Sequence, residues 1–124
     1  MKEIEKMNIL NASLLAMKRA IIKLKKKPEQ ILIDGNKIPK IKDYNLKYVI
    51  KGDEKIHEIS AASIIAKVAR DKLITKMSKK FTKYAWDKNA GYGTKLHLIA
   101  IKKFGVTKHH RKTFGPIHNI LSPN

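Results

Sequence analysis

The chain has 124 residues, 43% of them hydrophobic, which suits a single domain with a modest core. Its 28 Lys and Arg against 10 Asp and Glu give a net charge of +18, which favours a polyanionic partner, nucleic acid before membrane, unless a general bias toward lysine explains the excess. The absence of cysteine excludes disulfides and thiolate metal sites, and no apolar run approaches the roughly 20 residues of a membrane span, so a cytoplasmic protein is expected.

The first half of the chain is predicted to form one helix and two short strands. Residues 8–27 carry apolar side chains at helical spacing, with Asn8 or Asn11 as the cap and Pro28 after the end. The apolar run "QILID" (30–34) predicts a buried strand that Gly35 ends, and "KYVIKGD" (47–53) repeats the order strand, glycine, aspartate. The connection between these strands is too short for another helix of ordinary length.

The second half is predicted to be mainly helical. Residues 57–81 give the clearest helix, with Ser60 as a candidate cap. A loop over 84–94 leads into a helix over 95–104, and a basic, irregular tail follows. The order α-β-β-α-α indicates the α/β class, although two strands make a poor independent sheet. The apolar face of the 57–81 helix is expected to consist of Ala62, Ile65, Ala69, Leu73 and Met77.

Two aspartates share one context, because Asp34 and Asp53 each lie at or just beyond the C-terminal end of a strand that is predicted to be buried. In open α/β sheets this edge binds ligands, and neighbouring strands would bring the two carboxylates together. Carboxylate oxygens suit Mg²⁺ or Mn²⁺, and with a basic surface they point to metal-assisted phosphodiester chemistry. The alternative is that Asp-Gly and Gly-Asp are ordinary turn pairs, and spacing alone favours that alternative.

Three longer strings resemble one known family. "ILIDG…KYVIKGDEKIHEISAASIIAKVARD", then "GYGTKLHLIAI" and "GVTKHHRKTF", resemble ribonuclease HII over about Asn8 to Phe114, in the family's order. The resemblance implies a ribonuclease H-like α/β fold with Mg²⁺ or Mn²⁺ as cofactor. It also implies, as substrates, the RNA strand of RNA–DNA hybrids and duplex DNA that is cut on the 5′ side of an embedded ribonucleotide.

The same resemblance implies roles for six residues. Asp34 matches the metal-binding aspartate of the family's "DG" strand end, and Asp53 in "KGD" matches its fourth active-site acid. Tyr92 in "GYGT" matches the tyrosine that packs on the sugar beside the ribonucleotide, although its chemistry alone favours a half-buried loop residue. The remaining three lie in the same blocks as candidate phosphate contacts: Lys51, Lys67 and Arg70.

Other polar and aromatic residues are interpreted without a catalytic role. His97, one turn into the 95–104 helix, is expected to be structural, and Trp86 to be a packing residue. Asp71 is expected to pair with a basic neighbour on its helix. For His109 and His110, in the basic tail, phosphate contact or solvation is expected in preference to metal binding.

The family's opening motif "DEVGRG", which supplies two of its four active-site acids, has no counterpart in the sequence. We therefore expect a ribonuclease H-like domain truncated at the N-terminus, with a body over about 1–106 and a tail over 107–124. No protein partner is evident beyond a missing N-terminal fragment. Exposed apolar faces predict weak stability for the chain alone. The two missing acids leave the family's two-metal site incomplete, so we do not expect the chain alone to be a competent nuclease. A non-catalytic nucleic-acid-binding module and an inactive fragment are the alternatives.

Overall fold

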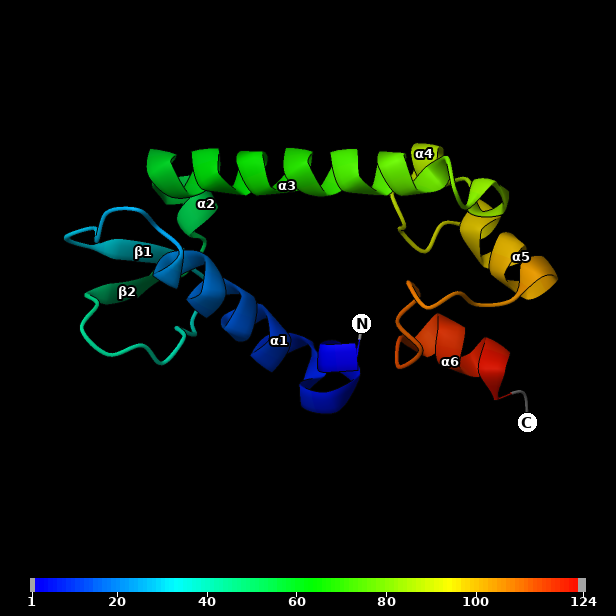
Figure 1. The fold of residues 1–124 in the computed structure, drawn as a ribbon, viewed down its shortest axis with the longest axis horizontal. Helices are drawn as coiled ribbons and strands as arrows, with labels where there is room; N and C mark the ends of the chain where they lie inside the picture. The colour runs from blue at the N-terminus through cyan, green and yellow to red at the C-terminus, as the bar shows by residue number, and fades with distance from the viewer. Residues whose placement is uncertain (1, 123–124) are drawn as a thin grey trace. The chain divides into compact units, whose positions relative to one another are not determined.

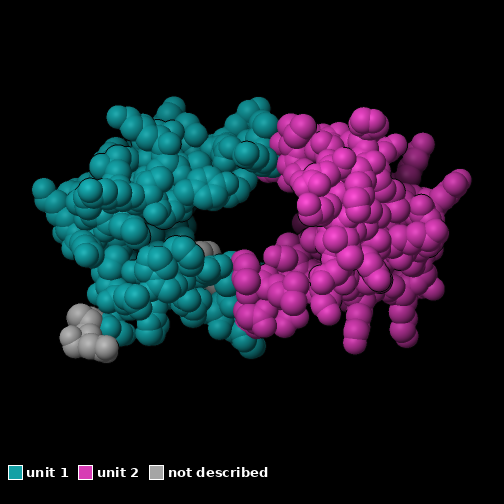
Figure 2. All heavy atoms as spheres, turned by 180° about the vertical axis from the view of Figure 1, so that it is seen from behind, with its two compact units in different colours: residues 1–6, 67–124 teal, residues 7–66 magenta. Residues whose placement is uncertain are grey.

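The computed structural model describes residues 2–122 and divides the chain into two compact units (Figure 2). One unit consists of Met1–Lys6 and Lys67–Asn124, and the other of Met7–Ala66. None of the helices in the described residues is both long and apolar enough to span a bilayer. The elements along the chain are α1 (Lys2–Ile22), β1 (Ile31–Asp34), β2 (Leu46–Val49), α2 (Gly52–Lys55), α3 (His57–Ser78), η1 (Thr82–Tyr84), α4 (Trp86–Asn89), α5 (Lys95–Phe104) and α6 (Gly115–Leu121) (Figure 1).

The Met7–Ala66 unit contains a parallel pair of strands, which Figure 1 shows side by side. Ile31 is paired with Leu46 and Asp34 with Val49, so both strands end at the same edge. Ile33 is buried in β1, but the Tyr48 side chain of β2 is 55% exposed. The prediction of two neighbouring strands in an α/β protein is confirmed, whereas the prediction that both are buried is wrong for β2.

Helix α1 differs from its prediction at both ends. It begins at Lys2 and bends at Asn8, whose φ of 68° is left-handed and whose side-chain Oδ1 accepts a hydrogen bond from the Asn11 N–H at 3.0 Å. Asn8 is thus the residue that caps the helix predicted from residue 8. The helix ends at Ile22, before the predicted residue 27, and the N–H groups of Lys23 and Leu24 donate to carbonyls three residues earlier.

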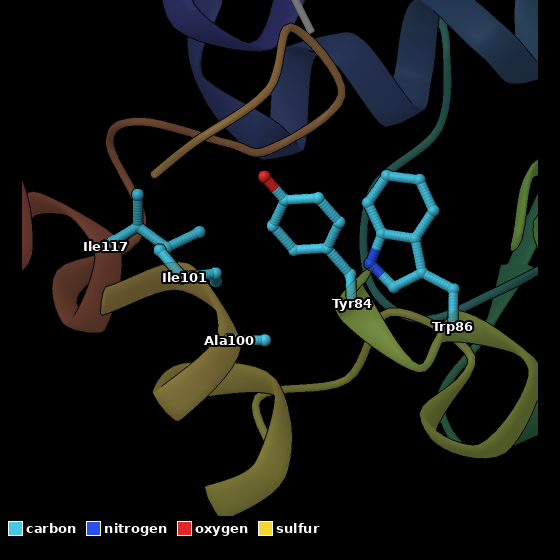
Figure 3. Close-up of a cluster of buried hydrophobic side chains, with 5 residues drawn as sticks. All are labelled: Tyr84, Trp86, Ala100, Ile101 and Ile117. Atoms are coloured by element: carbon cyan, nitrogen blue, oxygen red, sulfur yellow. The ribbon is translucent and has the colours of Figure 1, made fainter. Parts of the chain in front are cut away.

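The unit that contains Lys67–Asn124 has a core of aromatic and aliphatic side chains. Figure 3 shows Tyr84 and Trp86 near Ala100, Ile101 and Ile117, and Ile101 is only 1% exposed. The Tyr84 and Trp86 rings stack with centroids 5.5 Å apart. Trp86 is therefore a packing residue, as predicted.

Three predictions for the C-terminal half are wrong. The helix over Gly115–Leu121 lies in the tail predicted to be irregular, and its Ile117 is buried in the core. On α3, Ser60 lies inside the helix and does not cap it. Ile65 and Leu73 on the predicted apolar face are 70% and 58% exposed, whereas Ile59 is buried. The helix forms as expected, but most of that face is not covered within the described residues.

Candidate active-site and nucleic-acid-contact residues

Asp34 is the last residue of β1, and its side chain reaches across to the segment after β2. Its Oδ1 accepts a hydrogen bond of 2.8 Å from the backbone N–H of Gly52. The backbone N–H of Gly35 donates to the Val49 carbonyl at 3.0 Å, which continues the pairing beyond the last strand residue. These two bonds hold the ends of the neighbouring strands together and orient the Asp34 carboxylate.

Gly52 is buried at this edge, and its lack of a side chain is what permits the packing. A Cβ added there would lie 2.6 Å from Cδ1 of Ile59 and 3.3 Å from Cβ of Val49. The preceding residue, Lys51, has a φ of 55°, so the chain turns sharply just before α2. The "KGD" string thus forms a tight turn that brings its backbone to Asp34.

Asp53 follows Gly52 directly, in the first turn of α2, four residues beyond the end of β2. Both Asp34 and Asp53 are exposed to solvent. Two carboxylates suit an Mg²⁺ or Mn²⁺ site in which water and phosphate oxygens supply the other ligands. Within residues 2–122, no cluster of three or more His, Asp or Glu side chains forms a complete ligand set. The two residues of this acidic edge, Asp34 and Asp53, thus fall short of a complete ligand set by themselves.

Lys51, a candidate phosphate contact, lies beside this acidic edge. Its Nζ is 3.5 Å from Oε2 of Glu54, and both side chains are largely exposed. An exposed ion pair of this kind contributes little to stability, so the pairing leaves the ammonium group accessible to another anion.

The structure brings Arg70 and Tyr92 together. The Arg70 guanidinium lies over the Tyr92 ring, 4.9 Å from its centroid, and it also pairs with the Asp71 carboxylate at 3.2 Å. The Tyr92 side chain is 56% exposed, which contradicts the half-buried alternative and leaves the ring accessible. Lys67 is exposed one turn earlier on α3. The expected contacts Lys67, Arg70 and Tyr92 therefore belong to the same unit.

A second arginine–aromatic pair, which the sequence interpretation missed, adjoins the same loop. The Arg111 guanidinium lies 4.9 Å from the centroid of the Phe114 ring. The Phe114 ring in turn lies against Gly93, 3.6 Å from where a Cβ would stand. An arginine three residues before an aromatic residue is a pattern that the sequence shows. The fold is needed to place this pair beside the loop that carries Tyr92.

Two histidines of this unit are buried and hydrogen-bonded to each other. His97 and His110 are 4% and 5% exposed, and their Nε2 atoms are 3.1 Å apart. His97 is structural, as predicted, but the prediction of a solvated or phosphate-bound His110 is wrong, because the ring packs beneath Tyr84 and Trp86. Burial, followed by the neighbouring His97, lowers the pKa of His110 from 6.5 to about 4.

This lowered pKa predicts that the unit loses stability in acid. The pKa of His110 returns to 6.5 on unfolding, so between pH 6.5 and about 4 the unfolded chain binds more protons than the folded one. The contribution of the neutral, buried His110 to the stability of the fold is complete above pH 6.5 and is lost as the pH falls to about 4. After a discount for contact with solvent, we expect a loss of about 1–2 kcal/mol.

Urea unfolding between about pH 8 and pH 4, followed by the fluorescence of Trp86, measures this loss. Trp86 suits the measurement because it is the only tryptophan of the chain and it contacts His110. The variant His110→Gln should flatten the pH dependence, while His118→Gln, at an exposed position of α6, should leave it intact. An unchanged slope in His110→Gln would show that other groups cause the acid loss.

The sequence matches one protein family over most of its length. The family model for ribonuclease HII matches residues 1–116. The ribonuclease HII of Pelagibacter ubique (strain HTCC1062) is 72% identical over 120 residues, which cover 97% of this chain and 64% of the relative. The ribonuclease HII of Neisseria meningitidis serogroup C (strain 053442) is 50% identical over 98% of the chain and 62% of its own length.

A third relative, the ribonuclease HII of Roseobacter denitrificans (strain ATCC 33942 / OCh 114), is 47% identical over 97% of the chain and 61% of its own length. The chain thus spans somewhat more than three-fifths of the length of these curated relatives. With its mixed helices and small parallel sheet, the chain belongs to the ribonuclease HII family and has a ribonuclease H-like α/β fold.

Proposed function

We propose that the chain forms part of a divalent-metal-dependent endoribonuclease. Its substrates would be the RNA strand of RNA–DNA hybrids and single ribonucleotides embedded in duplex DNA. The hydrogen bond from the Gly52 N–H to Asp34 carries the proposal, because it joins the two strand-end segments that bear Asp34 and Asp53. A turn-forming aspartate caps its own turn, whereas Asp34 bonds to a residue 18 positions away.

In the proposed site, Asp34 and Asp53 would hold Mg²⁺ or Mn²⁺ through their carboxylate oxygens. Such an ion, when bound, supplies activation of a water molecule and stabilisation of charge on the leaving oxygen. The chain's own contribution is orientation: the Gly52 N–H fixes one oxygen of Asp34, and the buried Gly52 keeps this contact short. Lys51 places a positive charge beside the same edge for a phosphate of the substrate.

We also propose nucleic-acid contacts within the unit that contains Lys67–Asn124. The Arg70 guanidinium lies over the Tyr92 ring, and its N–H groups that do not pair with Asp71 are available for phosphate oxygens. The exposed Tyr92 ring offers an apolar face for the sugar beside the ribonucleotide. Lys67, Arg111 and Phe114 extend the basic and aromatic surface, and the net charge of +18 favours any nucleic acid over neutral partners.

The proposed location of the protein is the cytoplasm, without a membrane partner. The proposed organisation is one partial catalytic domain with a body over about 1–106 and a tail over 107–124. A preceding segment of the family, with its additional acids, would complete the ligand set that Asp34 and Asp53 begin.

The decisive experiment compares two proteins on a labelled duplex that contains one ribonucleotide. One is the chain itself, and the other, the fusion protein, adds to it the part of the Pelagibacter ubique relative outside the match. We expect the fusion protein to cut on the 5′ side of the ribonucleotide with Mn²⁺ and to leave the duplex intact in EDTA. The chain alone, with two candidate carboxylate ligands, should cut far more slowly, and an all-DNA duplex should remain whole.

The second candidate function is a non-catalytic nucleic-acid-binding module, which the two arginine–aromatic pairs favour. It predicts binding to any duplex that weakens steeply with salt and needs no metal ion. If the fusion protein binds in this way but does not cut with Mn²⁺, the binding module replaces the nuclease proposal. A preference for the ribonucleotide-containing duplex that depends on Mn²⁺ would instead count against the binding module.

A further inference from the structure

The protonation of the buried histidine pair is fixed by its neighbours, starting at Thr107. The Thr107 backbone N–H, which is always a donor, donates to Nδ1 of His110 at 2.9 Å. Nδ1 of His110 must therefore be an acceptor, so the proton of the neutral ring sits on Nε2. From there it points at Nε2 of His97, 3.1 Å away.

The same reasoning fixes the His97 ring. Its Nε2 lies 3.1 Å from Nε1 of Trp86, whose N–H is also always a donor, so this nitrogen carries no proton. Its single lone pair is shared between the Trp86 N–H and the Nε2–H of His110. The proton of His97 is consequently on Nδ1, which donates to the carbonyl oxygen of Tyr92 at 2.8 Å. One directed chain of hydrogen bonds thus runs from Thr107 through His110 and His97 to the backbone of Tyr92.

This series of hydrogen bonds ends at Tyr92, which is a proposed substrate contact. The Tyr92 carbonyl accepts from His97 and from the Thr94 N–H at 2.8 Å, and the Tyr92 N–H donates to the Asn89 carbonyl at 2.8 Å. The backbone of Tyr92 is therefore held from both sides, while its ring extends outward and is 56% exposed. His110 also holds the segment that leads to Arg111 and Phe114.

We infer that His97 is a positioning residue, whose Nδ1–H, in the tautomer set by His110 and Trp86, holds Tyr92 in place for the sugar of the substrate. The inference rests on the proposed function for the role of Tyr92, but the hydrogen-bond chain itself does not. The inference predicts that the preference for the ribonucleotide-containing duplex depends on a hydrogen-bond donor at the position of Nδ1 and not on the imidazole ring as such. Asparagine supplies that donor from its Nδ2, whereas leucine fills the space without one.

The test measures the affinity of the full chain for a duplex with one ribonucleotide relative to an all-DNA duplex, by fluorescence anisotropy at low salt. We expect His97→Leu to reduce this ratio about 5- to 10-fold and His97→Asn to keep it within about twofold. In the Tyr92→Ala background, His97→Leu should cause no further loss, because the group it positions is gone. Equal losses in both His97 variants, or an undiminished loss beside Tyr92→Ala, overturn the inference.

A second measurement keeps the inference testable if His97→Leu fails to fold or the unsubstituted chain does not discriminate between the duplexes. The ¹⁵N spectra of the imidazoles of the unsubstituted chain should show the proton on Nδ1 of His97 and on Nε2 of His110. The opposite tautomers would refute the positioning role whatever the chain binds. The expected tautomers, together with a fusion protein that shows no preference for the ribonucleotide-containing duplex, would leave the hydrogen bonds from Thr107 to Tyr92 standing and contradict the proposed function instead.

Discussion

Asp34→Asn is expected to lower the rate at which the fusion protein cuts the ribonucleotide-containing duplex by about 100-fold or more. Asparagine keeps an oxygen at the Oδ1 position, so the 2.8 Å hydrogen bond from the Gly52 N–H is retained. What the substitution removes is the negative charge. Loss of cleavage with an intact fold therefore reports the charge of Asp34 and not its part in holding the turn.

The matched control for this substitution is Asp43→Asn. Asp43 is an exposed aspartate in the same unit, and its φ of 64° lies in the left-handed region that asparagine tolerates well. It undergoes the same change of charge away from the strand edge, so cleavage should stay within about twofold of the unsubstituted protein. Cleavage that survives Asp34→Asn would remove Asp34 from the proposed metal site.

Calorimetric titration of the fusion protein with Mn²⁺ measures binding of the ion separately from cleavage of the duplex. Asp34→Asn should weaken Mn²⁺ binding by about 10-fold or more, and Asp43→Asn should not. If Asp34→Asn abolished cleavage while Mn²⁺ bound normally, Asp34 would act on the substrate and not on the ion. The two measurements thus assign its role as well as its importance.

How much of this site the sequence predicts depends on whether each feature is local. The two strands, their ends at Asp34 and near Gly52, and the cap at Asn8 follow from apolar runs, glycines and capping residues that act within a few positions. The sequence does not predict that the two strands pair in parallel, because this pairing joins residues such as Ile31 and Leu46, which are 15 positions apart. The spacing alone favours Asp34 as a turn former, and the family resemblance is what makes it a candidate metal ligand.

The features that the sequence missed depend on tertiary contacts or on an underrated local signal. His110 looks like one more basic residue of the tail, and only its hydrogen bonds to Thr107 and His97 show a buried neutral ring. Helix α6 had a readable signal, because Gly115-Pro116 places a proline at the start of the helix, where proline is favoured. The apolar face of α3 was predicted from its period alone, which does not reveal whether anything covers Ile65 or Leu73.

Those uncovered faces bear on the alternative that the chain is an inactive fragment, and Ile101→Ala tests it. Ile101 belongs to the cluster in Figure 3 and is 1% exposed, so the truncation should leave a cavity and lower the free energy of unfolding by about 3 kcal/mol. Ile99→Ala, on the same helix but 52% exposed, should cost less than about 1 kcal/mol. Trp86 fluorescence during urea unfolding reports both, because Trp86 belongs to the cluster.

The contrast between these two variants is more informative than either value. A large difference shows that the cluster of Tyr84, Trp86 and Ile101 is a packed core, and that core supports the histidine chain and the Tyr92 loop above it. Equal costs would mean that Ile101 is no more buried in solution than Ile99. A chain with no cooperative transition at all would favour the inactive fragment, since neither the Tyr92 loop nor the Asp34 edge is then held in a binding geometry.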